Sequence, residues 1–294
     1  MHRVDFIAAL VCLVLALPAA AQSSDPVAAA SSVVARAAQA SATPAQVAAP
    51  DDDPDLDVNK SQPDFALATI PTTLRLPVHR MAFRLTHRFN EQIDKAKLAG
   101  LFGLDSGAQV GLELRYGLFR GAQLGFYRTA DRTIEFFTQY DVVQQRKSRP
   151  IGLAVVASAE GTNNFKDSYS PSIGAVVSHE LGTRGAFYVA PRWVNNSNPL
   201  PKELVDHNSS VILGVGARIR VMTTTYVMVE VNPRVGGYKP GKSPMTFAIE
   251  KRAGGHLFQL NFSNAHGTTP AQVARGGPDS NNWYLGFNLS RKFF

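Results

Sequence analysis

The chain has 294 residues, 45% of them hydrophobic and 18% charged, and a formal net charge of +7. Its single cysteine, Cys12, lies in an apolar stretch near the N-terminus, which excludes a disulfide framework and a thiolate metal site from the rest of the chain. The basic charge suits anionic lipid head groups, lipopolysaccharide phosphates or anionic solutes. No cluster of Lys and Arg with interleaved aromatic residues appears, so nucleic acid is not an expected partner.

Residues 1–21 have the pattern of a signal peptide. Arg3 precedes an apolar run over residues 6–17, and small side chains follow up to Ala21, which predicts cleavage after that residue. The apolar run is shorter than the roughly 20 residues that a spanning helix needs, so a retained anchor is the weaker alternative. We therefore expect an exported protein, located in the bacterial cell outer membrane if the remaining chain can form a membrane barrel.

Residues 22–68 are expected to form a disordered periplasmic tail. Ala, Ser, Gln, Pro and Asp dominate this stretch, and an acidic run occupies residues 51–57. No apolar stripe recurs at helical spacing, which favours disorder over structure. An Ala-rich helix over residues 26–46 is the alternative, because Ala favours helix.

From residue 69 to residue 294 the sequence predicts one transmembrane antiparallel β-barrel with an up-and-down order of about twelve strands. Short segments alternate apolar and polar side chains, and Gly, Asn, Asp, Ser and Pro separate the segments. The last segment illustrates the pattern, since Phe287 and Leu289 share one face whereas Asn288 and Ser290 share the other. The fold class is therefore all-β.

The connections between these segments alternate in length. One set is mostly long and covers residues 90–108, 128–132, 161–169, 195–208, 236–244 and 264–281. The other set is short and covers residues 117–121, 144–150, 182–185, 222–225 and 253–255. Long external loops and tight periplasmic turns are typical of outer-membrane barrels, and a sandwich with Greek-key crossings would not produce them so regularly.

Charged side chains fall on the polar phase of the strands, where they would line the lumen. These predicted lumen-lining residues are Arg84, Arg88, Glu113, Arg115, Glu135, Asp141, Arg192, Arg218, Arg220, Glu230, Arg234, Glu250 and Arg252. Charge at these positions would be too costly against lipid, so the lumen must be wet or internally paired. Either the Arg and carboxylate groups pair across the lumen and close it, or an excess of Arg lines a narrow pore that prefers anions.

Aromatic residues predict two belts at the membrane surfaces. The expected outer belt consists of Tyr169, Trp193, Tyr238, Phe247 and Trp283, and the expected inner belt of Tyr116, Phe187, Tyr226, Phe293 and Phe294. Phe293 and Phe294 are also the predicted C-terminal barrel signal, read by the barrel-assembly machinery. In this interpretation Phe293 continues the lipid-facing row and Phe294 is a recognition element at the inner boundary.

Four stretches resemble an uncharacterised bacterial outer-membrane β-barrel family, a domain of unknown function. They are His87-Arg88-Phe89, Phe102-Gly103-Leu104-Asp105-Ser106-Gly107-Ala108, residues 250–264 and residues 285–294. The resemblance extends from about residue 69 to the end of the chain. It implies an outer-membrane barrel, and it supplies neither an activity nor catalytic residues.

Three functions remain open at this point. The first is a narrow porin-like channel for small solutes, anions among them. The second is a closed structural or surface-binding barrel that acts through its long loops and meets outer-membrane lipid and lipopolysaccharide. The third is a lipid-modifying enzyme, which is the weakest because Ser209, Ser210 and Ser263 lie beside histidines without the alternation that a lipid-facing Ser/His pair needs. The scattered histidines predict neither a metal site nor a cofactor. Because the Ser/His pattern is missing as well, we expect that the protein is not an enzyme.

Overall fold

The computed structural model describes residues 59–96, 100–104, 106–200, 207–278 and 281–294. The first strands are β1 (Met81–Gln92), β2 (Ala108–Phe119), β3 (Ala122–Thr129), β4 (Ile134–Val143), β5 (Gly152–Gly161), β6 (Asp167–Glu180) and β7 (Gly185–Asn195). They are followed by β8 (Ser209–Met222), β9 (Thr225–Val231), β10 (Arg234–Gly237), β11 (Met245–Ala253), β12 (His256–Ser263) and β13 (Tyr284–Lys292). Short helical segments α1 (Ile93–Ala96), η4 (Leu101–Gly103), α2 (Thr162–Phe165) and α3 (Pro270–Arg275) lie in the connections.

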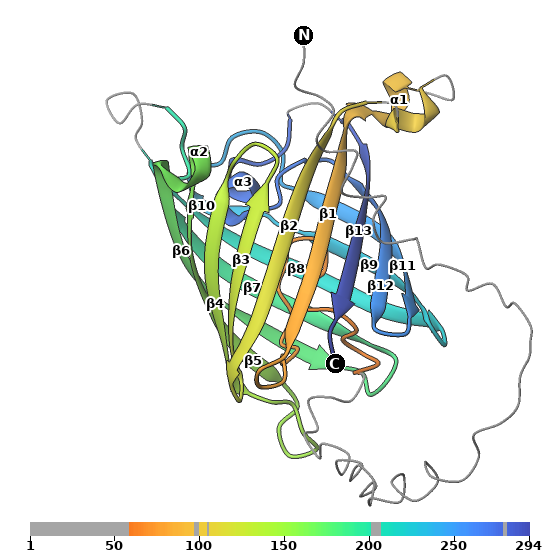
Figure 1. Cartoon of the computed structure of the whole chain (residues 1–294). Coiled ribbons are helices and arrows are strands. Elements are labelled where there is room, and N and C mark those ends of the chain that lie inside the picture. Colours follow the sequence, from red (N-terminus) through yellow and green to blue (C-terminus); the bar gives the residue numbers. More distant parts are fainter. Residues whose placement is uncertain (1–58, 97–99, 105, 201–206, 279–280) are drawn as a thin grey trace, which may run out of the picture. The chain divides into compact units, whose positions relative to one another are not determined.

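The strands close into an antiparallel barrel (Figure 1). β13 pairs with β1 in the register Ala82↔Lys292 to Arg88↔Gly286, so the last strand does close the ring on the first. β8 pairs with both β9 and β10, and Pro233 lies between these two. Because proline cannot donate a ladder hydrogen bond, β9 and β10 form one interrupted wall strand. The ring therefore has twelve wall positions, as the sequence predicted.

The barrel wall has its polar side inward and its apolar side outward. In β4 the buried residues are Glu135, Phe137, Gln139 and Asp141, whereas the alternate residues, such as Phe136, are exposed. Large apolar side chains are likewise exposed along the other strands. An outward apolar band around a polar interior is the arrangement of a transmembrane barrel.

The predicted alternation of connections is confirmed in part. In the set predicted to be short, 120–121, 181–184, 223–224 and 254–255 have two to four residues, but 144–151 has eight. In the set predicted to be long, 93–107, 196–208 and 264–283 are long, whereas 130–133 and 162–166 have only four and five residues. Figure 1 shows α1, α2 and α3 at the end of the barrel opposite the C-terminus. Among the described residues, no helix has the length and apolar character needed to cross a membrane.

The aromatic belts are correct for the exposed residues Tyr169, Trp193 and Phe247 at one end and Phe187 and Phe293 at the other. The prediction of Tyr226 in the inner belt is wrong, because its side chain is fully buried rather than facing lipid. It has the parity of Met228 and Glu230, which are both buried in the lumen, so its place in the alternation determines its direction. The signal peptide at residues 1–21 and the tail up to residue 58 lie outside the described residues.

Candidate functional site: an occupied lumen

Residues 59–76, here called the plug, lie inside the barrel (Figure 1). Leu67 and Ile70 pack in one buried cluster with Val156, Val176 and Met228 of the wall. The predicted disordered tail is therefore wrong for residues 59–68. The reason is that the polar side chains of this segment, which suggest solvent in the sequence, are hydrogen-bonded to the barrel wall instead.

Glu230 holds a turn of the plug. Its carboxylate accepts hydrogen bonds from the backbone N–H groups of Ala68 at 2.9 Å, Thr69 at 3.0 Å and Ile70 at 3.2 Å, and from the Thr69 hydroxyl at 2.6 Å. The turn itself is closed by the bond from Leu67 N to Ile70 O at 2.8 Å. Glu230 is 1% exposed, so the plug amides replace water as the partners of a buried charge.

Two inward arginines bind carbonyl groups of the plug. Arg218 donates from Nη2 to Ala66 O at 2.8 Å, and a bidentate pair with Glu250, at 2.6 and 2.9 Å, fixes its guanidinium. Arg84 donates from Nη2 to Leu67 O and to Ala68 O, and its Nη1 lies 3.7 Å from the Asp64 carboxylate. The charged lining thus does more than pair across the lumen, because it recognises the plug backbone.

Neutral polar groups complete the attachment of the plug. These contacts run from Gln139 Nε2 to Thr72 O at 2.8 Å, from Gln123 Nε2 to Leu74 O at 3.3 Å and from Ser290 Oγ to Asp64 Oδ2 at 2.7 Å. Arg75 also forms an ion pair with Asp141. Both backbone and side chains of the plug are therefore satisfied by wall residues, as a buried segment requires.

A second segment, the loop of residues 264–278, occupies the other end of the lumen through α3. Glu160 of β5 accepts from the Thr269 hydroxyl at 3.1 Å and from Ala271 N at 2.9 Å, at the N-terminus of this helix. Arg234 donates to Ala274 O at 3.3 Å, near its C-terminus. An acid at the first turn and a base at the last turn match the helix dipole, so two separate strands of the wall, β5 and β10, hold α3 in place.

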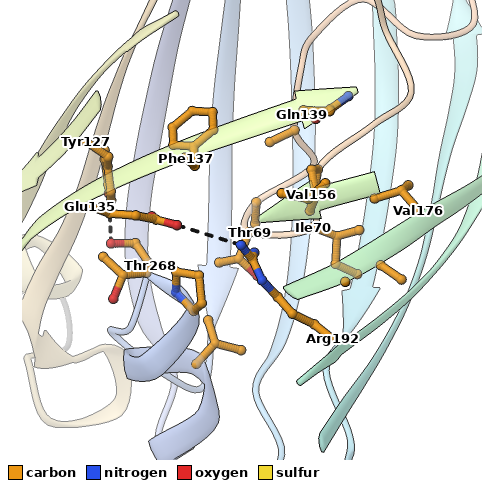
Figure 2. A pocket seen from close by; sticks show the side chains of 18 of the residues that line it. Thr69, Ile70, Tyr127, Glu135, Phe137, Gln139, Val156, Val176, Arg192 and Thr268 are labelled. Carbon is orange, nitrogen blue, oxygen red and sulfur yellow. Dashed lines mark hydrogen bonds and ion pairs between the residues drawn. The ribbon is translucent and has the colours of Figure 1, made fainter. Parts of the chain in front are cut away.

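Between the plug and α3 lies a cavity of about 80 Å³, here called the chamber. Figure 2 shows Glu135 and Arg192 pointing toward one another in it, with Arg192 Nη2 and Glu135 Oε1 3.7 Å apart. Arg192 also donates to Ser172 Oγ at 3.0 Å and to Ser158 Oγ at 3.2 Å. Apolar lining comes from residues such as Ile70, so the chamber is polar on one side and apolar on the other.

The predicted lumen-lining residues all belong to the inward or rim-facing phase. The buried ones are Arg84, Arg88, Arg115, Glu135, Asp141, Arg218, Glu230, Arg234 and Glu250, and the partly exposed ones are Glu113, Arg192, Arg220 and Arg252. The chamber brings together Arg84, Glu113, Arg115, Glu135 and Arg192. Arg220 instead lies near a barrel rim, where it donates to Thr183 Oγ1 at 3.1 Å. Sequence reasoning missed Gln123 and Gln139, which the same parity could have identified, and Asp64, for which no periodic signal exists.

The two C-terminal phenylalanines point in different directions. Phe293 is 49% exposed on the outward side, in line with the lipid-facing row. Phe294 packs instead against a cluster formed by Phe65, Leu74 and Leu76 of the plug and Ala82 of β1. The terminal side chain therefore contacts the plug at the inner end of the barrel.

Two of the three serines considered for catalysis, Ser210 and Ser263, are engaged in structural hydrogen bonds. Ser210 Oγ lies 2.8 Å from Ser197 Oγ and donates to Tyr238 O at 2.7 Å. Ser263 accepts from Thr246 at 3.0 Å. Both serines are buried on the inner side of the wall, so their hydroxyls do not face lipid.

Two titratable groups in the long loops have shifted pKa values. Burial lowers the pKa of His266, whose Nε2 lies 3.1 Å from Phe89 O. Burial alone would raise the pKa of Asp131, but hydrogen bonds from Thr129 and from Thr133 N outweigh it and lower that pKa. Burial therefore favours the neutral form of His266, and the hydrogen bonds favour the ionised form of Asp131.

Comparison with known proteins found solved structures of low sequence identity to this chain. Among curated proteins, none matches the chain. Similar solved structures include a mutant of the porin from Rh. blastica, with 11% identity, coverage of 63% of this chain and 55% of the porin, and a TM-score of 0.33. The chain thus spans about half the length of that porin.

Two further similar structures cover more of their own chains. An outer membrane channel from Pseudomonas putida F1 has 12% identity, coverage of 74% of this chain and 97% of its own, and a TM-score of 0.45. Outer membrane phospholipase A from Escherichia coli has 9% identity, coverage of 73% and 92%, and a TM-score of 0.41.

The family comparison covers most of the chain. Residues 64–293 match the family described as "Membrane bound beta barrel domain (DUF5777)". The matched region begins at Asp64, inside the plug, and continues through the last strand. The resemblance read from the sequence is therefore confirmed, and the chain belongs to this family of membrane-bound β-barrels.

Proposed function

We propose that the protein is an outer-membrane channel for small polar solutes whose path is closed in the observed state by the plug and by α3. The observation that carries this proposal is the chamber, a space at mid-lumen with charged groups on one side, which lies between two segments that are not part of the wall. If either segment moves, the groups that now bind it become a charged lining for water and solute. The membrane placement is supported by the outward apolar band and by the family.

The contacts that close the lumen are compatible with gating. Glu230 and Arg218 bind the plug through hydrogen bonds to its backbone, and water can replace backbone partners when the plug leaves. A hydrogen bond to a charged group contributes about 1.5–3 kcal/mol net, so a few of them hold a segment without locking it. Release of the plug is then an equilibrium that a solute or membrane component can shift.

We further propose that the opened lumen prefers anions. Arg192 and Arg115 each face a carboxylate, at Glu135 and Glu113 respectively. Arg88 differs, because among the described residues no carboxylate forms a salt bridge with it. Arg88 is buried in the closed state, so an anion can approach it, without displacing an acid, only once the lumen has opened.

Planar-bilayer recording of the purified full chain tests this proposal. We expect rare conductance steps for the parent protein and more frequent steps for Glu230→Gln, which weakens the attachment of the plug. Reversal potentials in a salt gradient should indicate anion preference. If neither protein shows conductance steps while both retain heat-modifiable gel migration, the channel proposal fails.

A closed barrel that acts through its long loops is the second candidate. It is favoured by the density of wall-to-plug contacts, which leave little open space along the lumen. Under this alternative, replacing loop residues 264–278 would change surface binding, to lipopolysaccharide for example, and conductance would be absent in all variants. Separate recordings and binding assays on the same preparation discriminate between the two functions.

We infer that the protein is not a lipid-modifying enzyme. Support comes from Ser210 and Ser263, whose hydroxyls are directed into the lumen and hydrogen-bonded there. Unchanged lipid turnover after substitution of either serine by Ala, against the untreated membrane background, checks this inference. We also propose that Phe293 and Phe294 form the C-terminal signal recognised by the barrel-assembly machinery. Phe293 is exposed at the barrel end, and Phe294 packs against the plug in the folded barrel.

A further inference from the structure

A basic pocket lies at the inner end of the barrel, and its lining residues differ from those of the chamber. It has a volume of about 90 Å³ and is lined by Arg252, His256 and Lys292 of the wall, Phe294 at the C-terminus and Pro63 of the plug. Arg252 comes from the end of β11, and Lys292 from the end of β13. Pairing of both strands with β12 brings these two ends together, through Arg252↔Leu257 and Leu257↔Ser290.

The two long basic side chains of this pocket have unused hydrogen-bonding capacity. Arg252 Nε is buried and has no hydrogen-bond partner among the described residues. Lys292 Nζ lies 5.6 Å from the centre of the Phe65 ring, a cation–π contact that leaves its three donors free. Within the described part of the chain, neither side chain forms a salt bridge with a carboxylate.

The carboxylates in this part of the lumen are bound to other groups. Asp64 accepts from Ser290 Oγ at 2.7 Å and lies 3.7 Å from Arg84 Nη1. Glu250 forms the bidentate pair with Arg218 and also accepts from Gln259 Nε2 at 2.7 Å. Arg252 and Lys292 are both partly exposed, and they outnumber the single carboxylate of the lining, at the C-terminal Phe294, so the pocket has a positive charge that an anion can compensate.

We propose that the basic pocket binds a phosphate group. A planar guanidinium and a neighbouring ammonium are the pair of groups that recognise phosphate by hydrogen bonding and by charge. The turn next to Arg252 has Gly254 in a left-handed conformation, with φ of 57° and open space around it, so a compact tetrahedral anion meets no side chain there. The volume of the pocket suits an inorganic phosphate or the phosphate of one head group.

The position of the pocket allows both sources of phosphate. Lys251 is exposed on the outward side next to Arg252, and Arg291 is exposed next to Lys292. These outward cations stand where lipid phosphates approach a barrel rim. Because Pro63 belongs to the plug, an anion in the pocket also contacts the segment that closes the lumen.

The test uses the full chain in maltoside micelles, which contain no phosphate, and measures binding of inorganic phosphate by isothermal titration calorimetry. Arg252→Gln and Lys292→Gln should each weaken binding about tenfold or more, since each removes a charged partner. Lys251→Gln is the matched control, because this cation neighbours Arg252 on the same strand and faces outward. Heat-modifiable gel migration verifies that every variant is folded, and Arg252→Lys should restore part of the affinity.

A second arm identifies the source of the phosphate group. Phosphatidylglycerol added to the micelles should compete with inorganic phosphate if the pocket takes a lipid head group, and should leave phosphate binding unchanged if it takes the free anion. Both results support the site, provided that the Arg252 and Lys292 variants lose binding. The proposal is overturned if the parent chain binds no phosphate in either form, or if the two variants bind as well as Lys251→Gln does.

Discussion

The attachment of the plug at Glu230 offers the sharpest test of how the lumen is closed. Substitution of Glu230 by Gln retains the size of the side chain but removes the charge and places an NH₂ group against backbone donors. Four hydrogen bonds to the carboxylate are affected, three from N–H groups and one from the Thr69 hydroxyl. Glu230 also lies beside Asn232, which donates to it at 3.2 Å.

The expected loss follows from the strength of such bonds. A hydrogen bond to a charged group contributes about 1.5–3 kcal/mol, and bonds to one carboxylate are not additive because released amides regain water. We therefore expect the free energy of opening of the plug turn to fall by about 3 kcal/mol, which is the contribution of one or two such bonds. This corresponds to roughly a 100-fold increase in the opening equilibrium.

Native-state hydrogen exchange on the full chain in micelles measures this equilibrium at individual amides. The amides of Ala68, Thr69 and Ile70 should exchange roughly 100-fold faster in the variant, whereas ladder amides of β4 should be unchanged. Glu113→Gln is the control, because that carboxylate pairs with Arg115 of the same strand. Unchanged protection of residues 68–70 in Glu230→Gln, or an equal loss in both variants, would refute the assignment of Glu230 as the anchor.

Three further predictions concern the plug and the loop that carries α3. Phe65→Ala removes a buried ring from the cluster with Leu74 and should cost about 3–5 kcal/mol of plug docking, seen as faster exchange over residues 64–74, whereas Phe293→Ala on the outer face should not change this exchange. Glu160→Gln should speed exchange of the first amides of α3 by about tenfold or more, since one charge-assisted bond is lost; equal exchange rates would exclude a capping role. The pKa of His266 is lowered in the folded loop, so the unfolded chain takes up the proton first as the pH falls. The folded loop therefore has its full stability above pH 6.5, the ordinary pKa of histidine, and loses stability as the pH falls toward the folded pKa. Exchange in residues 264–275 should therefore quicken below pH 6.5 after correction for the intrinsic rate, and His266→Gln should remove this pH dependence.

Much of the wall could be predicted from the sequence because the barrel imposes a period of two. Phe287 and Asn288 already distinguish the two faces of the last strand, and the positions of the inward charges follow by counting. The interruption at Pro233 was not predicted, because Val235 continues the apolar parity across it. Tyr226 was misplaced for the opposite reason, since residue type was given more weight than parity.

The plug was not predictable by the same reasoning. A segment surrounded by wall on all sides needs no amphipathic period, so Asp64, Thr72 and Thr73 follow no pattern that separates an inner from an outer face. Their partners are far away in sequence, on strands such as β6 and β13, and no local rule connects them. A similar limit applied to α3, where the pair of Glu160 and Thr269 joins residues of separate segments. The sequence did show charged residues such as Arg218 and Glu230 on the inward phase of the strands, and these are the residues that bind the plug.

The roles of those charges depend on the plug being part of the same chain as the wall. Residues 77–80 connect the plug directly to β1, and this connection is pinned by the bonds from His79 N to Gly117 O at 2.8 Å and from Gly117 N to Arg80 O at 3.0 Å. A Cβ at Gly117 would lie 2.1 Å from Pro77 O, so only glycine permits this crossing. The plug is therefore an intramolecular ligand with a fixed pivot, and its rebinding does not incur the entropy of association. For this reason hydrogen bonds of modest net strength suffice to keep the lumen closed, and a change that loosens Glu230 or Arg218 shifts the equilibrium without removing the plug from reach of the wall.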